Sequence, residues 1–152
     1  MLHNLSNIVE TVLLSSTIPA SGTSTDRYTD CVDTRGYQGV RFVCVTDTTH
    51  ATAGFSGYAQ LSATSSGTGT FYDVYGSTVT HTTGFITASA VEVVDIYRPL
   101  WRWARMYFDR ATTAESIVCV IAELYRSQIE DGGFSTSYGV SDVNIVIGAS
   151  SS

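Results

Sequence analysis

The residues best suited to contact a partner are concentrated in the ten-residue stretch Ile96 to Arg105, IYRPLWRWAR. This stretch holds three of the eight basic residues of the chain and both of its tryptophans. Arg, Trp and Tyr dominate the hot spots of protein interfaces. The candidate interface residues here are Arg98, Trp101, Arg102, Trp103 and Arg105.

The segment from Trp103 onward has the pattern of a strand with two different faces. Side chains alternate along a strand, so Ala104, Met106 and Phe108 would share one face, and Trp103, Arg105 and Tyr107 the other. This pattern predicts a core on the first face and an aromatic, cationic surface on the second. An alternative is that the arginines pair with nearby acids such as Asp95 and Asp109 while the tryptophans fill the core.

Both ends of the chain combine apolar runs with flexible linkers. At the N-terminus the apolar run Ile8 to Ile18 is followed by the linker Pro19 to Ser24. At the other end, the residues from about 129 onward are rich in Gly and Ser and precede the apolar run Val143 to Ile147. A tethered apolar run commonly finds a groove or a sheet edge on another molecule. The N-terminal run therefore adds four candidate interface residues, Ile8, Val12, Leu13 and Leu14.

No pattern of side chains predicts catalysis, a metal site or a cofactor. The histidines His3, His50 and His81 show no ligand spacing, and the carboxylates match no calcium loop. The three cysteines include no C-x-x-C pair, so we expect three buried, reduced thiols, as in a protein of a reducing compartment. We expect a binding protein without an active site.

Composition narrows the range of partners. The formal charge is −6, lysine is absent, and charged residues make up only 14 % of the chain, while Ser and Thr supply roughly a quarter of it. Such a chain has few basic side chains with which to bind phosphates, so nucleic acid is not expected as a partner.

No run reaches the roughly 18 apolar residues of a membrane helix. Residues 8–18 lack a basic flank, and we expect them to belong to the mature protein.

Short runs rich in Val, Ile, Thr, Tyr and Phe alternate with turn-forming clusters, which is typical of antiparallel sandwiches. Residues 114–130 could form a helix capped by Thr112 and Glu115, but the β-branched block Ile117 to Ile121 favours a central strand covered on both faces. The expected strands are Ile8–Thr17, Arg27–Asp33, Val40–Val45, Gly57–Thr64, Thr70–Tyr75, Ser77–Thr82, Ala90–Tyr97, Trp103–Phe108, Ser116–Tyr125 and Val143–Ile147.

Several motifs, in this order, resemble those of small head proteins of tailed bacteriophages. They are Asp33-Thr34-Arg35-Gly36-Tyr37, Ala59-Gln60-Leu61-Ser62, Phe71-Tyr72-Asp73-Val74, Val94-Asp95-Ile96-Tyr97-Arg98-Pro99 and Trp103-Ala104-Arg105. The resemblance covers about residues 29–128. Trp101-Arg102-Trp103 and the loop Thr46 to Gly54 depart from the family pattern.

The resemblance implies a β-sandwich on the outside of an icosahedral head, where it cements major capsid subunits as a symmetric oligomer. Repeated weak contacts would then gain avidity. We expect a jelly-roll-like antiparallel sandwich at 29–128, an N-terminal arm at 1–28, a C-terminal Gly/Ser-rich arm at 129–152, and a homotrimer on the capsid of a virion. The alternative is a carbohydrate-binding sandwich or tail-fibre module that uses exposed Trp and Tyr rings. An enzyme on a sandwich scaffold would need converging carboxylates or histidines.

Overall fold

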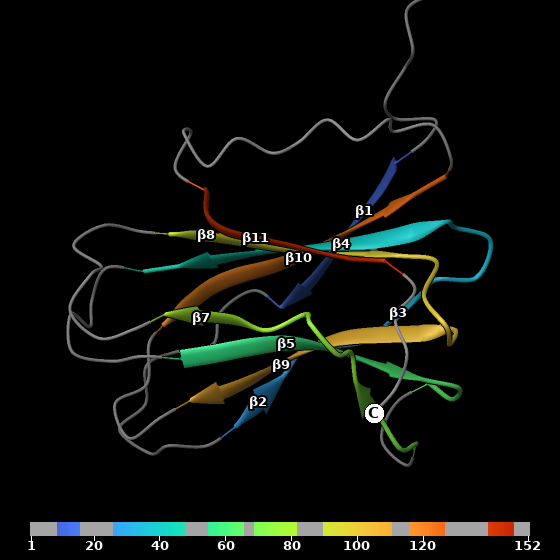
Figure 1. Ribbon diagram of the computed structural model, residues 1–152, viewed down its shortest axis with the longest axis horizontal. Coiled ribbons are helices and arrows are strands. Elements are labelled where there is room, and N and C mark those ends of the chain that lie inside the picture. Colours follow the sequence, from blue (N-terminus) through green and yellow to red (C-terminus); the bar gives the residue numbers. More distant parts are fainter. Residues whose placement is uncertain are drawn as a thin grey trace, which may run out of the picture.

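Two β-sheets are stacked face to face (Figure 1). The computed structural model describes residues 9–15, 26–47, 55–65, 69–81, 90–110, 116–126 and 140–147. Within these ranges every element of regular secondary structure is a β-strand. They are β1 (Val9–Ser15), β2 (Arg27–Tyr28), β3 (Val32–Asp33), β4 (Gly39–Thr46), β5 (Phe55–Ser62), β6 (Tyr72–Asp73), β7 (Val79–His81), β8 (Val91–Tyr97), β9 (Trp103–Arg110), β10 (Ile117–Tyr125) and β11 (Val140–Ile147).

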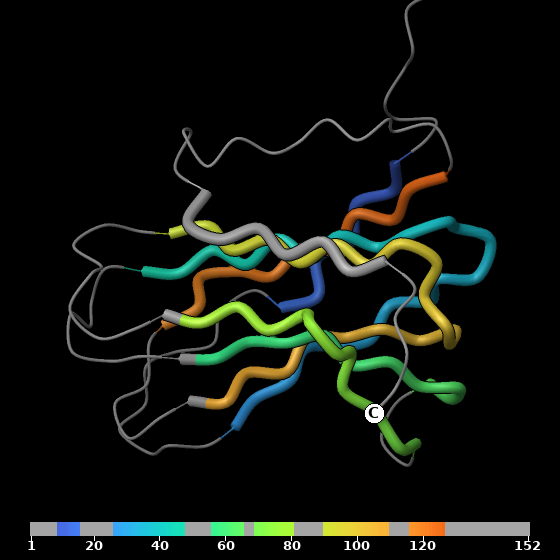
Figure 2. The backbone as a smooth tube through the Cα atoms, in the orientation of Figure 1, coloured from blue at the N-terminus to red at the C-terminus, as the bar shows by residue number. Residues whose placement is uncertain are grey.

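The first sheet has the strand order β1-β10-β4-β8-β11 and the second the order β2-β9-β5-β6. In the second sheet β3 also pairs with β9, and β7 also pairs with β5. Every pair is antiparallel except β8 and β11, which run parallel. The backbone tube shows the two stacked layers in the same orientation (Figure 2). The prediction of an all-β fold built from antiparallel sheets is confirmed, and the parallel β11 was not expected.

The expected strands correspond closely to the observed ones, with one division. The predicted strand Arg27–Asp33 is two strands, because the backbone ladder with β9 is incomplete at Thr29, whose amide still donates to the Met106 carbonyl at 2.9 Å. The Thr29 hydroxyl accepts a hydrogen bond from the Met106 amide at 3.1 Å, and it also lies 2.8 Å from the Asp30 carbonyl oxygen. The helix alternative for residues 114–130 is wrong over the part that the structure describes, where Ile117–Tyr125 is a strand.

The core lies between the two sheets and follows the alternation predicted for β9. Ala104, Met106 and Phe108 are fully buried, whereas Trp103, Arg105 and Tyr107 on the opposite face are half-buried. In the first sheet β4 shows the same alternation, whereas β8 is buried on both faces from Glu92 to Ile96. The largest fully buried apolar side chains of this sheet are Phe42, Ile96, Ile117, Val40, Val94 and Val120.

Strand β10 occupies the interior of the first sheet, between β1 and β4, as its apolar character predicted. Its two faces differ, however. Ile117 and Val120 are buried in the core, whereas Val118 is 42 % exposed and Ile121 is half-buried. The expected cover over both faces of β10 is therefore incomplete within the described part of the chain.

The three cysteine thiols are free, but only Cys44 is fully buried, because Cys31 and Cys119 are half-buried. Burial raises the pKa of the Cys44 thiol far above its usual value, which keeps it protonated and unreactive. No disulfide joins these three thiols in the structure, and their reduced state stays a prediction. The prediction that all three are buried is wrong for Cys31 and Cys119.

The described parts of the predicted arms are strands of the two sheets. Strand β1 forms one edge of the first sheet beside β10, and β11 forms the other edge beside β8. Strand β2, at the end of the predicted N-terminal arm, pairs with β9 in the second sheet.

Candidate interaction surface

A shallow groove of about 430 Å³ separates the turn after β3 from the loop between β8 and β9. Three of the candidate residues from the sequence, Arg98, Trp101 and Arg102, line it from the loop side. The remaining lining residues are Thr34, Arg35, Tyr37, Gln38, Pro99 and Leu100. The groove is open and mixes apolar and cationic side chains, which suits a segment of another macromolecule better than an enclosed small molecule.

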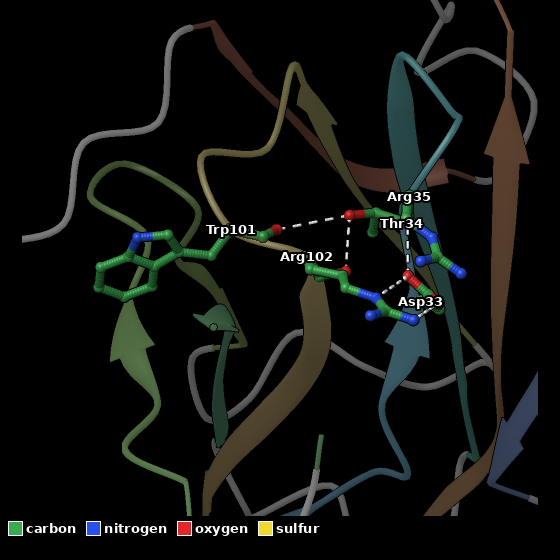
Figure 3. Close-up of polar contacts among 5 residues, drawn as sticks. All are labelled: Asp33, Thr34, Arg35, Trp101 and Arg102. Carbon is green, nitrogen blue, oxygen red and sulfur yellow. Dashed lines mark hydrogen bonds and ion pairs between the residues drawn. The ribbon is translucent and has the colours of Figure 1, made fainter. Parts of the chain in front are cut away.

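A compact set of polar contacts holds the two walls of the groove together (Figure 3). The Arg102 guanidinium donates two hydrogen bonds to the Asp33 carboxylate, from Nε at 2.9 Å and from Nη2 at 2.7 Å. The backbone amide and the hydroxyl of Thr34 each donate to the Arg102 carbonyl at 2.8 Å. The Arg35 amide donates to Asp33 at 3.0 Å. This network fixes the position of the loop relative to the turn.

The Arg102 guanidinium lowers the pKa of the Asp33 carboxyl to about 2, with a further contribution from the Arg35 amide. Because the folded-state pKa lies below the unfolded value, the pair adds stability at pH values above about 4 and loses it as the pH falls towards 2.

We expect Arg102→Gln to raise the Asp33 pKa by about one unit or more, measured by NMR titration of the carboxyl carbon. Arg35→Gln, which keeps the backbone donor, should raise it less. Equal shifts in the two variants would contradict this assignment.

The Arg98 backbone adopts a left-handed conformation, with φ of 55°, directly before a proline. This conformation is unfavourable for a residue with a side chain, and strained residues of this kind cluster at functional sites. The Arg98 amide donates to the Gln38 carbonyl at 2.6 Å, which ties the loop to the turn a second time. The guanidinium lies 5.1 Å from the centre of the Tyr97 ring.

Trp101 and Leu100 form the apolar part of the groove. The Trp101 indole is partly buried against the core and meets the Tyr72 ring edge-on, with 4.5 Å between ring centres. Figure 3 shows this indole pointing away from the Asp33–Arg102 pair. Leu100 is 58 % exposed. Its exposure in a groove leaves apolar surface for a partner to cover.

The outer face of the second sheet continues from the groove along β9. Arg102 stacks on the Trp103 ring at 5.0 Å, and Arg105 and Tyr107 follow Trp103 on the same face. Cross-strand neighbours on β5 stand opposite them in register: Ser62 opposite Trp103, Gln60 opposite Arg105, and Tyr58 opposite Tyr107. The Tyr58 and Tyr107 rings are 4.9 Å apart. The predicted aromatic, cationic face is confirmed.

The alternative pairing with nearby acids is wrong in its details. Arg102 pairs with Asp33, and Asp95 is instead the partner of Arg41. The tryptophans do not fill the core, since Trp101 only packs against it and Trp103 lies on the outer face.

The N-terminal candidate residues divide between the core and the surface. Leu14 is buried in the core, Val12 packs against it, and Leu13 is 61 % exposed. Ile8 lies outside the described residues. Among the described three, Leu13 is therefore the residue that a partner could contact without displacing the core.

Residues 34–36 lie between two expected strands and were not among the candidate site residues from the sequence. The β3–β9 register sets Asp33 opposite Trp103, which brings this turn to the groove. The Asp-Thr-Arg-Gly-Tyr motif was the available signal, because Thr34, Arg35 and Tyr37 all line the groove.

The described residues contain no helix long and apolar enough to cross a membrane. In the same residues no three His, Cys, Asp or Glu side chains are grouped so that they could hold a metal ion. Comparison with known proteins gives no match to a family model and no match to a curated protein.

Proposed function

We propose that this protein is a virion structural protein that binds the outer surface of a phage capsid and stabilises contacts between major capsid subunits, without catalysis or a cofactor. The observation that carries the proposal is the groove lined by Arg98, Leu100, Trp101 and Arg102 on a rigid sandwich. Its cationic and apolar side chains are the types enriched in protein interfaces, and its backbone is anchored by the Asp33–Arg102 pair.

The strand order supports a jelly roll, an architecture of viral capsid and lectin domains. If β2 with β3 and β6 with β7 each count as one bent strand, the ten strands β1 to β10 reduce to eight. Numbered along the chain, these eight have the order 1-8-3-6 in the first sheet and 2-7-4-5 in the second. Two Greek keys folded over each other produce this order.

We further propose that the protein acts as a symmetric oligomer, with a trimer favoured, assembled in the bacterial cytoplasm and located on the capsid surface. The exposed Leu13 on edge strand β1 and the exposed Val118 on β10 supply apolar surface for contacts between copies. Repetition of modest contacts around a head increases the total strength of attachment.

The test is co-sedimentation of the purified protein with undecorated heads. Trp101→Ala should weaken head binding by about tenfold or more, in the range of an interface hot spot. Leu100→Ala is the second variant, because the exposed Leu100 side chain contributes little to the core. Tyr75→Ala is the matched control, since Tyr75 is 80 % exposed and lies outside the groove. A folded protein that never co-sediments with heads refutes the proposal.

The second candidate function is carbohydrate binding, as in a lectin or tail-fibre module. It is favoured by the exposed rings of Tyr72 and Tyr75, which are 42 % and 80 % exposed. Exposed aromatic rings can serve as platforms for sugar rings. Binding on a glycan array that is lost on replacing these tyrosines, together with absence of head binding, would favour this second function.

A further inference from the structure

The Arg105 side chain is held in an unusual environment on the outer face of the second sheet. Its guanidinium carbon lies 3.7 Å from the centre of the Phe71 ring and 4.4 Å from the centre of the Tyr28 ring. Its Nε donates to the Gln60 side-chain oxygen at 2.8 Å, and the Gln60 amide nitrogen donates to Asp73 at 2.8 Å. Aromatic contacts and a two-step hydrogen-bond relay thus fix the orientation of this guanidinium.

The fixed guanidinium has no carboxylate partner among the described residues. The described ion pairs belong to Arg41 and Arg102, and Asp73 reaches Arg105 only through Gln60. Partial removal of its charge from water lowers the pKa of Arg105, and the groups that oppose this effect are Tyr28, Cys31 and Tyr107 rather than a carboxylate. Partial removal of a cation from water costs free energy unless an anion pairs with it.

We propose that Arg105 is a carboxylate-binding site, completed by an Asp or Glu side chain of the protein partner. A planar guanidinium binds a carboxylate through two parallel hydrogen bonds along one edge. In Arg105 the Nε is already used by Gln60, so the terminal Nη groups provide this edge. The site rests on the proposed function only for the identity of the partner, because the isolated protein should already bind carboxylates.

A protein side chain fits this site better than an acidic sugar. Sugar recognition uses an aromatic face next to the polar contact, but the Phe71 and Tyr28 rings are occupied by the guanidinium itself. The surrounding surface continues into Trp103 and the groove, where apolar and cationic groups alternate as in protein interfaces. Pre-ordering of Arg105 also lowers the entropy lost on binding.

The experiment uses the full chain and two peptides, one rich in Glu and a neutral counterpart with Gln at the same positions. NMR or calorimetry should detect binding of the acidic peptide alone, and Arg105→Gln should weaken it by about tenfold or more. Arg105→Lys keeps the charge without the planar edge and should recover only part of the affinity. Arg27→Gln is the matched control, because Arg27 lies on neighbouring β2, is exposed, and bonds to the Asp26 carbonyl rather than to aromatic rings.

Equal weakening by Arg105→Gln and Arg27→Gln would show general charge attraction and overturn the proposal. Binding of sialic or uronic acid through Arg105, without binding of the acidic peptide, would also overturn it. Head binding that is unaffected by Arg105→Gln, together with no Arg105-dependent binding of the acidic peptide, would retain the proposed function and reject this site. Arg105-dependent peptide binding by a protein that never binds heads would retain the site and reject the capsid function. Circular dichroism and thermal melting of each variant establish that it is folded.

Discussion

Replacing Asp95 with Ala should lower the free energy of unfolding by about 3 kcal/mol or more, the effect expected when one partner of a buried ion pair is removed. The Asp95 carboxylate accepts hydrogen bonds from Arg41 Nε and Nη2, at 3.1 and 3.0 Å, and from the Tyr125 hydroxyl at 2.6 Å. Its side chain is only 8 % exposed and that of Arg41 14 %. The variant would leave the partly buried Arg41 with only Glu123, 3.6 Å away, as a carboxylate partner, and it would leave the buried Tyr125 hydroxyl without this acceptor. Urea denaturation measures the loss.

Asp33→Ala is the control, because Asp33 also binds an arginine through two hydrogen bonds but does so at the surface. The side chains of Asp33 and Arg102 are 33 % and 41 % exposed, so solvent screening should keep the loss below about 1 kcal/mol. Asp95→Asn, which retains an acceptor for Tyr125, should have an intermediate effect. Similar losses for Asp95→Ala and Asp33→Ala would contradict the view that burial determines the contribution of these pairs.

The Asp95 network explains a glycine in the middle of the first sheet. Gly39 stands opposite both Tyr125 and Tyr97, and a Cβ atom at Gly39 would come within 2.1 Å of the Tyr125 ring. The glycine therefore lets the Tyr125 ring lie across β4 and bring its hydroxyl to Asp95. Burial and the Asp95 hydrogen bond both raise the pKa of Tyr125, which keeps the hydroxyl protonated as a donor.

Strand positions could be predicted from the sequence because they depend on local pattern. The alternation Trp103, Arg105, Tyr107 against Ala104, Met106, Phe108 specified which face of β9 is buried. The β-branched block in β10 correctly favoured a strand over a helix. The break at Thr29 was not predictable in this way, because it depends on a hydroxyl that substitutes for a ladder contact with distant Met106.

The pairing of charged residues could not be predicted from the sequence, because strand register decides it. Arg102 pairs with Asp33, 69 residues away, and Arg41 pairs with Asp95, 54 residues away. Closeness along the chain favours pairing of Asp95 with the arginines that follow it, but Arg41 stands opposite it in the β4–β8 register. The parallel β11 escaped prediction for the same reason, since nothing in its apolar run specifies direction.

The N-terminal strand has both a folding role and a candidate docking role, and two adjacent leucines can separate them. Leu14→Ala should lower the free energy of unfolding by about 2–3 kcal/mol, because Leu14 is 4 % exposed and packs in the core. Leu13→Ala should change it by less than about 0.5 kcal/mol, since Leu13 is 61 % exposed on the same strand. Urea denaturation of the two variants provides the comparison, and equal losses would contradict the placement of β1.

Head binding by the same two variants then tests the docking role. If Leu13 contacts a capsid subunit or a second copy, Leu13→Ala should weaken co-sedimentation with heads, while Leu14→Ala should leave it unchanged at temperatures where the variant is folded. Deleting residues 1–18 is a poorer experiment, because it removes β1 and uncovers the edge of β10. Loss of head binding after that deletion would combine lost stability with lost contacts. In contrast, Leu14→Ala changes the stability and Leu13→Ala changes the exposed surface, so the two effects are separated.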